Sequence, residues 1–264
     1  PRELATHGIG ESAALEYMAR IVHDYGLNLT DSTYAAHLQP PPLSVAVAAD
    51  ALASATNASL DTYDSGPATL AIETWAVDVL ARLAGLPETA GGVFGPGGSY
   101  SNLLALLIAR DQAGAARGLD IRHDGVAALG SPVVLCSRVA HFSVQRACAA
   151  LGLGESAVIT IDCDEQHRML PSALEAILAD PGVDPATGAT RTPFAVIATA
   201  GTTDFGTIDP LPEIAEIARR YGLWMHVDAA YGFGALFSDR LSGLLDGIAL
   251  ADSITLDLHK VGWQ

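Results

Sequence analysis

The strongest constraint on the fold is an alternation of short apolar runs with helical patterns, which begins near Gly95 and continues to the end of the chain. Runs rich in valine, isoleucine and leucine are expected to form strands over residues 132–136, 157–161, 194–198, 223–227 and 253–256. Strands that are apolar along their whole length are typical of parallel sheets covered on both faces. Amphipathic patterns predict helices over residues 99–117, 142–151, 171–178 and 211–221. The sequence therefore predicts an α/β fold, a mostly parallel sheet with helices on both faces.

The first part of the chain has a different pattern and predicts an N-terminal helical segment. Helices are expected over residues 12–25, 43–55 and 67–83. Three consecutive prolines, Pro40 to Pro42, lie between the first two and cannot continue a helix. We therefore divide the chain into a helical segment, residues 1–66, and a large domain, residues 67–264. Because the last apolar run ends a few residues before Gln264, we expect this domain to be incomplete at its C-terminal end.

Composition argues against several classes of partner. The net charge is −16, and such an acidic surface is unsuited to nucleic acids and to anionic membranes. No apolar run is long enough to span a bilayer, and no basic region followed by an apolar stretch opens the chain as in a signal peptide. The cysteines form no close pair and no spacing typical of metal ligands (Cys136, Cys148, Cys163). We therefore expect a cytoplasmic protein with reduced thiols and no bound metal.

Two charged residues that could carry chemistry follow predicted strands. Ligands of parallel α/β sheets bind beyond the carboxyl ends of the strands. Asp228 follows the fourth run, where a buried carboxylate either caps the next turn or pairs with a cation such as a protonated pyridine nitrogen. Lys260 follows the fifth run, and is either a solvated charge or a desolvated, nucleophilic amine.

Three further features share this predicted edge of the sheet. Residues 95–99 (Gly-Pro-Gly-Gly-Ser) precede a helix, whose free N–H groups would favour an anion such as a phosphate, although the segment could also be an ordinary turn. Thr202 and Thr203 follow the third run, and either hydrogen-bond a ligand or close a turn. His141 follows the first run, where a lone histidine is more often structural. Their joint occurrence at the ends of successive strands indicates one binding site.

These motifs resemble those of the group II pyridoxal-5'-phosphate (PLP)-dependent amino acid decarboxylases. This family includes the glutamate, aromatic amino acid and 2,4-diaminobutyrate decarboxylases. The most specific match joins His226-Val227-Asp228-Ala229-Ala230 to Asp257-Leu258-His259-Lys260. Residues 97–102, His141 with Ser143, and residues 198–203 are similar to further family blocks. The resemblance covers nearly the whole chain, and it implies the PLP-dependent transferase-like fold of type I.

The resemblance also implies catalytic roles for four residues. Lys260 holds PLP as a Schiff base, Asp228 pairs with the pyridinium nitrogen, and His141 stacks on the ring face. His259, which precedes the lysine, is the fourth. The cofactor-binding set that the resemblance implies combines these residues with the glycine turn and with other strand ends (Gly97, Gly98, Ser99, His141, Thr203, Asp228, Ala230, His259, Lys260).

The activity that the resemblance implies is decarboxylation of an L-amino acid to an amine and carbon dioxide, in a homodimer. Residues 37–42 and 55–61 are most similar to the 2,4-diaminobutyrate branch, and the identity of the amino acid stays open. Pro96 and Asp257 depart from the commoner family pattern.

Two alternatives to amino acid decarboxylation remain. One is other fold type I chemistry (aldehyde synthase, carbon–carbon lyase or aminotransferase), and the other is an inactive relative that acts as a binding or regulatory subunit.

Overall fold

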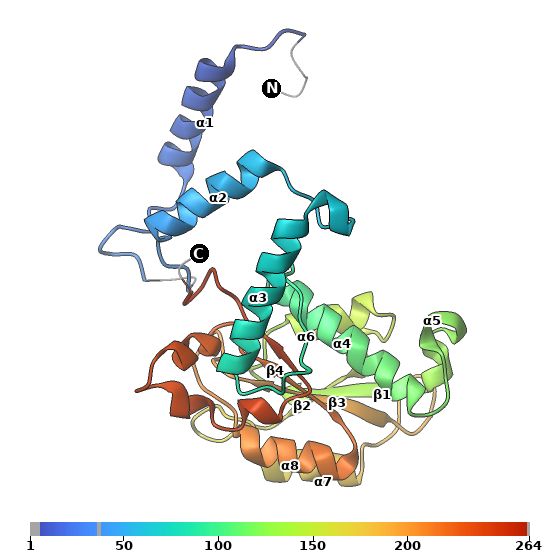
Figure 1. Ribbon diagram of the computed structural model, residues 1–264. Helices are drawn as coiled ribbons and strands as arrows, with labels where there is room; N and C mark the ends of the chain where they lie inside the picture. Colours follow the sequence, from blue (N-terminus) through green and yellow to red (C-terminus); the bar gives the residue numbers. More distant parts are fainter. Residues whose placement is uncertain (1–5, 36–37, 263–264) are drawn as a thin grey trace.

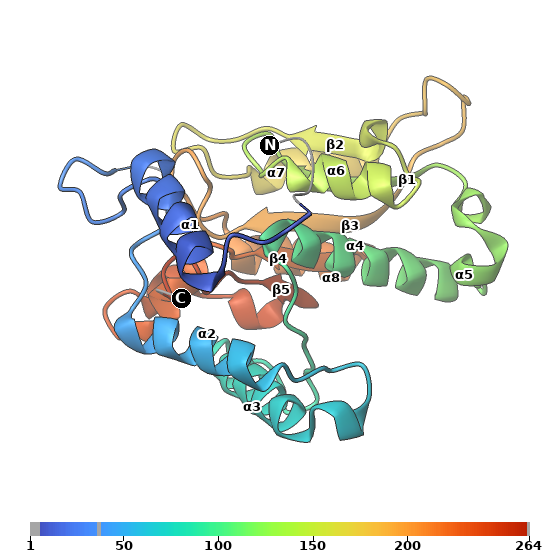
Figure 2. The same cartoon turned by 90° about the horizontal axis from the view of Figure 1, so that it is seen from above.

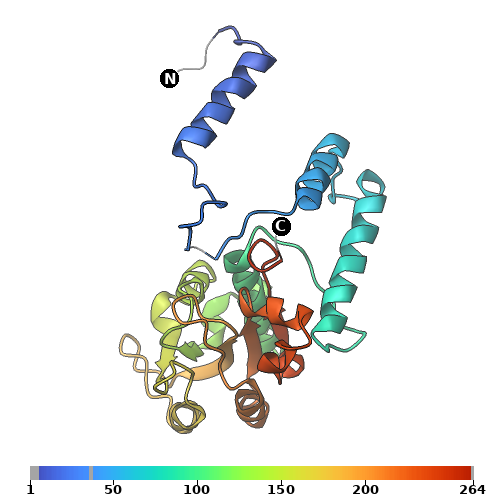
Figure 3. The ribbon, with the colours of Figure 1, turned by 90° about the vertical axis from the view of Figure 1, so that its left-hand side faces the viewer.

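The computed structural model describes residues 6–35 and 38–262 (Figure 1). Residues 1–5, 36–37 and 263–264 lie outside the described part, and with them His37 of the N-terminal block noted above. The later part of the chain forms a layered α/β body. Helices α1 (Glu11–Tyr25) and α2 (Ser44–Thr56) extend away from this body (Figures 1 and 3).

The sheet has five strands, all of them parallel to their neighbours. They are β1 (Pro132–Ser137), β2 (Val158–Ile161), β3 (Thr192–Thr199), β4 (Trp224–Asp228) and β5 (Ser253–Thr255). Their order is β2-β1-β3-β4-β5, and β2 and β5 lie at opposite edges in Figure 2. Each strand lies within two residues of its expected position. The predicted α/β class with a parallel sheet is confirmed.

Helices cover both faces of the sheet, because neighbouring strand residues point to opposite sides. On one face, α4 (Gly98–Ala115) and α6 (Ser143–Ala150) pack against side chains such as Val134 and Cys136. On the other face, α7 (Pro171–Ala179) and α8 (Leu211–Tyr221) pack against Leu135 and its neighbours. Figure 1 shows these two helix layers above and below the strands. Each fully buried leucine or isoleucine contributes about 2 kcal/mol to stability.

Short helices make up most of the other connections. Helix α5 (Ile121–Asp124) follows α4. Single 3₁₀ turns occur at Tyr63–Ser65, Val126–Leu129 and Glu155–Ala157. Between β4 and β5 the chain forms three more 3₁₀ turns (Gly232–Phe237, Ser242–Leu245, Ile248–Leu250). A loop of residues 180–191 joins α7 to β3.

The N-terminal helices leave many apolar side chains exposed. Helix α3 (Pro67–Leu83) contacts the main core through Leu80 and Leu83 near its end. Helices α1 and α2 bury no residue. Large apolar side chains on the three helices remain exposed, among them Leu15, Val22, Val45 and Trp75. Within the described residues, no helix combines the length and apolar character needed to span a membrane.

The sheet order creates a crevice at the carboxyl ends of the strands. The chain passes from β1 outward to β2 and then returns to the other side of β1 to form β3. Connections therefore leave neighbouring strands in opposite directions, which opens a space above the strand ends. The strands that flank this space end at Ser137, Thr199, Asp228 and Thr255.

A Gly201→Ala substitution tests how closely the segments beyond β3 and β4 approach. Gly201 has φ +98°, and a Cβ atom there would lie 2.9 Å from the amide nitrogen of Gly232. We expect a loss of about 1–3 kcal/mol in the free energy of unfolding, measured by urea denaturation. Gly188→Ala is the matched control, because Gly188 has φ +70° with open space around it. Equal losses in both variants would contradict the proposed steric cause.

Candidate active site

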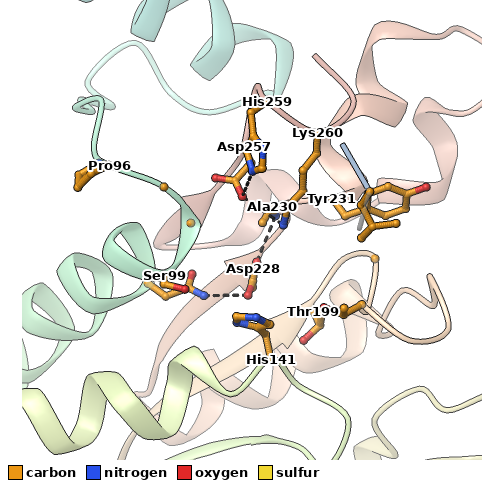
Figure 4. A pocket seen from close by; sticks show the side chains of 16 residues that line it. Pro96, Ser99, His141, Thr199, Asp228, Ala230, Tyr231, Asp257, His259 and Lys260 are labelled. Atoms are coloured by element: carbon orange, nitrogen blue, oxygen red, sulfur yellow. Dashed lines mark hydrogen bonds and ion pairs between the residues drawn. The ribbon is translucent and has the colours of Figure 1, made fainter. Parts of the chain in front are cut away.

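A cavity of about 270 Å³ opens at the carboxyl ends of the strands (Figure 4). The structure places all nine predicted site residues on its walls (Gly97, Gly98, Ser99, His141, Thr203, Asp228, Ala230, His259, Lys260). They come from the N-terminus of α4 and from the segments that follow β1, β3, β4 and β5. Residues that lie up to 163 positions apart in sequence, from Gly97 to Lys260, therefore share one space. Their individual roles stay predictions.

The glycine turn forms one wall, at the N-terminus of α4. Gly97 precedes the helix with φ +107°, a conformation that favours glycine. Within the described residues, the amides of Gly98 and Ser99 donate to no backbone or side-chain acceptor. A Cβ atom on Gly98 would lie 2.9 Å from Oδ2 of Asp257, so a larger residue would displace this carboxylate. Free amides at the positive end of the helix dipole suit a phosphate group.

Asp228 lines the cavity at the end of β4, and its side chain is held by two donors. Oδ2 accepts a hydrogen bond from Nδ2 of Asn102 at 2.8 Å, and Oδ1 accepts one from the amide of Ala230 at 3.1 Å (Figure 4). Asp228 is only 6% exposed. Two hydrogen-bond donors thus hold this buried carboxylate in place, in a position that suits a cationic ring nitrogen.

Lys260 lies beyond β5 and points into the cavity beside a carboxylate. Its Nζ atom lies 3.1 Å from Oδ2 of Asp257, and Nε2 of His259 lies 3.6 Å from the same oxygen. The side chain of Asp257 is 8% exposed and that of Lys260 is 22% exposed, whereas that of His259 is 56% exposed. The ion pair holds the lysine amine at the cavity wall and away from bulk solvent.

His141 follows β1 and contributes an imidazole ring. Nδ1 accepts a hydrogen bond from the amide of Ser143 at 3.3 Å and lies 2.9 Å from the Ser143 hydroxyl. Because Nδ1 accepts, the ring proton of the neutral imidazole sits on Nε2. Burial lowers the pKa of His141, and this outweighs the opposing charge of Asp228. The ring therefore enters the site uncharged near neutral pH.

Several residues that line the cavity were not among the site residues predicted from the sequence. Leu38 reaches the wall from the N-terminal segment, and Thr199 and Tyr231 flank the ends of β3 and β4. Asn102 and Asp257 contact predicted residues directly. Asn102 carried a detectable signal, because it is a polar residue one turn into a helix whose next apolar positions face the core. Leu38 lies within residues 37–42 and Tyr231 directly follows the matched block 226–230, so the resemblance included both without a role for either in the site.

Behind the cavity wall, His226 is fully buried within β4. Its Nε2 lies 3.0 Å from Oδ1 of Asn102, and its Nδ1 lies 2.9 Å from the hydroxyl of Ser253. Burial lowers the pKa of His226 to about 4, although the nearby charge of Asp228 opposes this shift. His226 is therefore a neutral hydrogen-bonding group at physiological pH.

The lowered pKa of His226 predicts a pH-dependent stability. The unfolded chain protonates this histidine near pH 6.5 and the folded chain only near pH 4, so acid favours unfolding between these values. A His226→Gln variant lacks this contribution. Its stability deficit relative to wild type should shrink by about 1 kcal/mol per pH unit as pH falls from 6.5 towards 4. Urea denaturation measures this deficit. His123→Gln, in exposed α5, is the control, and an equal change in that variant would contradict the assignment.

Residues 20–263 match a family model described as the pyridoxal-dependent decarboxylase conserved domain. The chain is 44% identical over 257 residues to an L-2,4-diaminobutyrate decarboxylase of Rhizobium meliloti (strain 1021), covering 97% of this chain and 48% of the relative. It is 38% identical over 216 residues to cysteine sulfinic acid decarboxylase of Homo sapiens, covering 82% of this chain and 42% of the relative. The chain thus spans about half the length of these curated relatives.

A solved structure shows the same architecture. It is the glutamate decarboxylase domain of diaminobutyrate-pyruvate transaminase and L-2,4-diaminobutyrate decarboxylase from Vibrio parahaemolyticus. The TM-score is 0.92 at 35% sequence identity, and the match covers 99% of this chain and 56% of that chain. The predicted fold type and the predicted cofactor, PLP, are confirmed by these findings. This chain belongs to the pyridoxal-dependent decarboxylase family.

Proposed function

We propose that the full-length protein decarboxylates an L-amino acid to the corresponding amine and carbon dioxide. One observation carries this proposal: Lys260, Asp228 and the N-terminal turn of α4 face a single cavity at the carboxyl ends of the strands. An amine, a buried carboxylate and an anion-binding turn are the three groups that a pyridine aldehyde with a phosphate arm requires. Family membership supports the reaction class.

The residues of the cavity fit PLP. The free amides of Gly98 and Ser99 would hold the phosphate, and Asp228 would face the ring nitrogen. The amine of Lys260 would bond to the cofactor, and His141 would lie against the ring face. Asp257 adds a negative charge near the phosphate turn, but Lys260 and His259 lie close enough to offset it. Thr203 and Ala230 would complete the cofactor shell.

When bound, PLP supplies an electron-accepting ring for the bond that breaks at the α-carbon of the substrate. The chain itself provides the surroundings. The carboxylate of Asp228 favours the proton at the ring nitrogen, as an opposite charge within a few ångströms typically shifts a pKa by about 1–3 units. His141 and the walls of the cavity exclude water from the reacting face. The amine of Lys260 would hold PLP covalently in the absence of substrate, and it would be free once a substrate amine takes its place.

For the substrate we propose L-2,4-diaminobutyrate. The relative with 44% identity is described as a decarboxylase of this amino acid. We expect kcat/KM for L-2,4-diaminobutyrate to exceed that for cysteine sulfinate and L-glutamate. An order reversed in favour of the acidic substrates would contradict this assignment.

An amino acid screen tests the reaction. Full-length protein is incubated with PLP and each L-amino acid, and carbon dioxide and amine are measured together. We expect equal amounts of both. An aldehyde formed with consumption of oxygen would indicate an aldehyde synthase, and a keto acid would indicate an aminotransferase. No visible absorption from bound cofactor would indicate an inactive binding or regulatory relative.

The exposed N-terminal helices support a homodimer. We propose that a second copy covers the apolar side chains of α1 and α2, in residues 1–66, and those of the adjoining α3, since apolar patches of this kind mark protein interfaces. The full-length protein should sediment as a dimer. Trp75→Glu places a charge on exposed α3 and should shift the protein towards monomer, whereas Val183→Glu in the loop before β3 should not. A monomeric wild type would contradict the proposal.

The three free thiols support a cytoplasmic location.

A further inference from the structure

Asn102 connects several parts of the cavity although it follows the phosphate-binding turn by only three residues. It lies in the second turn of α4 and is 2% exposed. Its side chain contacts Asp228, Ser143 and His226, which belong to β4 and to the start of α6. A buried amide with partners on three sides has one arrangement of its oxygen and nitrogen that satisfies all of them.

The carboxylate of Asp228 fixes that arrangement. An ionised carboxylate only accepts hydrogen bonds, so Nδ2 of Asn102 must face it, at 2.8 Å. The second proton of Nδ2 is donated to the hydroxyl oxygen of Ser143 at 2.9 Å. The Ser143 hydroxyl in turn donates to Nδ1 of His141 at 2.9 Å. The two protons of one amide group thus reach both the carboxylate and, through one hydroxyl, the histidine ring.

The side-chain oxygen of Asn102 fixes the tautomer of His226. Oδ1 of Asn102 only accepts, so Nε2 of His226 must carry the proton of the 3.0 Å hydrogen bond. Because His226 is neutral, its Nδ1 accepts a hydrogen bond from the Ser253 hydroxyl at 2.9 Å. That hydroxyl accepts from Nε1 of Trp224 at 2.8 Å. The chain of hydrogen bonds is neutral from Trp224 to Asn102, and it ends at the charge of Asp228.

We propose that Asn102 is a positioning residue that holds the Asp228 carboxylate and, through Ser143, the His141 ring in one arrangement, with His226 as its neutral support. This inference rests on the proposed function, in which Asp228 and His141 contact the same cofactor ring, one at its nitrogen and the other on its face. The amide of Asn102 cannot rotate without losing a hydrogen bond on every side. The counter-ion and the stacked histidine are therefore oriented together.

The histidine tautomers test the proposal directly. Full-length protein loaded with PLP is prepared with ¹⁵N-labelled histidine, and the ring nitrogens are observed by NMR at pH 7. The signals of His226 are assigned by their loss in His226→Gln. We expect the Nε2–H tautomer at His226 and at His141. An Nδ1–H tautomer at His226 would require the amide of Asn102 to be reversed, and it would overturn the proposal.

Enzyme kinetics give a second test through Asn102→Asp, which replaces the donor facing Asp228 with an oxygen of the same shape. We expect kcat to fall about ten- to a hundred-fold with KM changed less than threefold, because a hydrogen bond to a charged group is lost. The visible circular dichroism of bound PLP should also change. Gln112→Glu makes the same chemical change at an exposed position of α4 and should leave both unchanged. Wild-type kcat and dichroism in Asn102→Asp, or only a lower melting temperature, would overturn the proposal.

Ser143→Ala tests the same proposal if the Asn102→Asp protein does not fold. This variant keeps the bond between Asn102 and Asp228 and removes only the hydroxyl that joins Asn102 to His141. We expect the ring nitrogen signals of His141 to shift, because only the Ser143 amide still donates to Nδ1, while His226 keeps Nε2–H. Unchanged His141 signals would contradict the proposed link. Failure of the proposed function is recognised separately, as wild-type protein that binds PLP and releases no carbon dioxide.

Discussion

A Lys260→Ala variant of the full-length protein is expected to lose turnover by on the order of 10⁴-fold or more, because the amine that bonds the cofactor is removed. Lys260 is the single lysine among the 264 residues, which otherwise carry arginine as their basic side chain. No other side-chain amine among these 264 residues can replace it. The visible absorption that PLP acquires when it is bonded to a lysine should also disappear. Steady-state turnover and absorption of the PLP-loaded protein measure both effects.

A Lys260→Arg variant separates two roles of this residue. Lys260 pairs with the carboxylate of Asp257 at 3.1 Å, and arginine can keep an ion pair there. Arginine stays protonated and cannot form the covalent bond. If the amine acts as the nucleophile, Lys260→Arg should be as inactive as Lys260→Ala. Substantial turnover in Lys260→Arg would show that the ion pair with Asp257 is the important contribution, contrary to the proposed role.

The second large effect is expected for Asp228→Asn, which keeps the size of the side chain and removes its charge. The protonated ring nitrogen would lose its partner, and a shift of about 1–3 pKa units corresponds to a fall in kcat of about ten- to a thousand-fold. PLP should remain bound, since the phosphate turn and Lys260 are intact. The damage is thus expected in turnover more than in cofactor retention, and the dissociation constant of PLP and kcat measure the two.

Asp209→Asn is the matched control for this change. Asp209 is also a buried carboxylate held by backbone amides, those of Met169 at 2.7 Å and Thr199 at 2.8 Å, but it does not line the cavity. Its substitution should lower the stability and leave kcat within about threefold of wild type. Unchanged turnover in Asp228→Asn would contradict the role of Asp228 as a counter-ion. Equal losses of turnover in the two variants would attribute the effect to general destabilisation.

The positions of the strands and of the main site could be predicted from sequence for a clear physical reason. Strands buried on both faces are apolar along their length, so runs such as residues 194–198 differ sharply from their surroundings. Parallel strands also bring their carboxyl ends to one edge. Asp228, His141 and Lys260 could therefore be placed in one site without knowledge of the distances between them.

The hydrogen-bond partners of these residues could not be predicted in the same way. Asn102 is recognisable as a polar residue near the start of a helix, but its partner Asp228 lies 126 residues later. The contact depends on how α4 packs over β4, which residue patterns do not determine. The ion pair of Asp257 with Lys260 likewise depends on the local turn after β5, where Lys260 is the third residue after Asp257. The approach of Leu38 to the cavity depends on the path of the N-terminal segment.

The most direct test of the account is to reduce the PLP-loaded, full-length protein with borohydride and map the labelled peptide by mass spectrometry. Reduction converts the bond between the cofactor and an amine into a permanent one. The predicted result is one pyridoxyl group per chain, on Lys260, with its yield reduced by excess substrate amine added before the borohydride. A label at another amine in protein that turns over, with Lys260 unmodified, would contradict the claim that this cavity is the site of the chemistry.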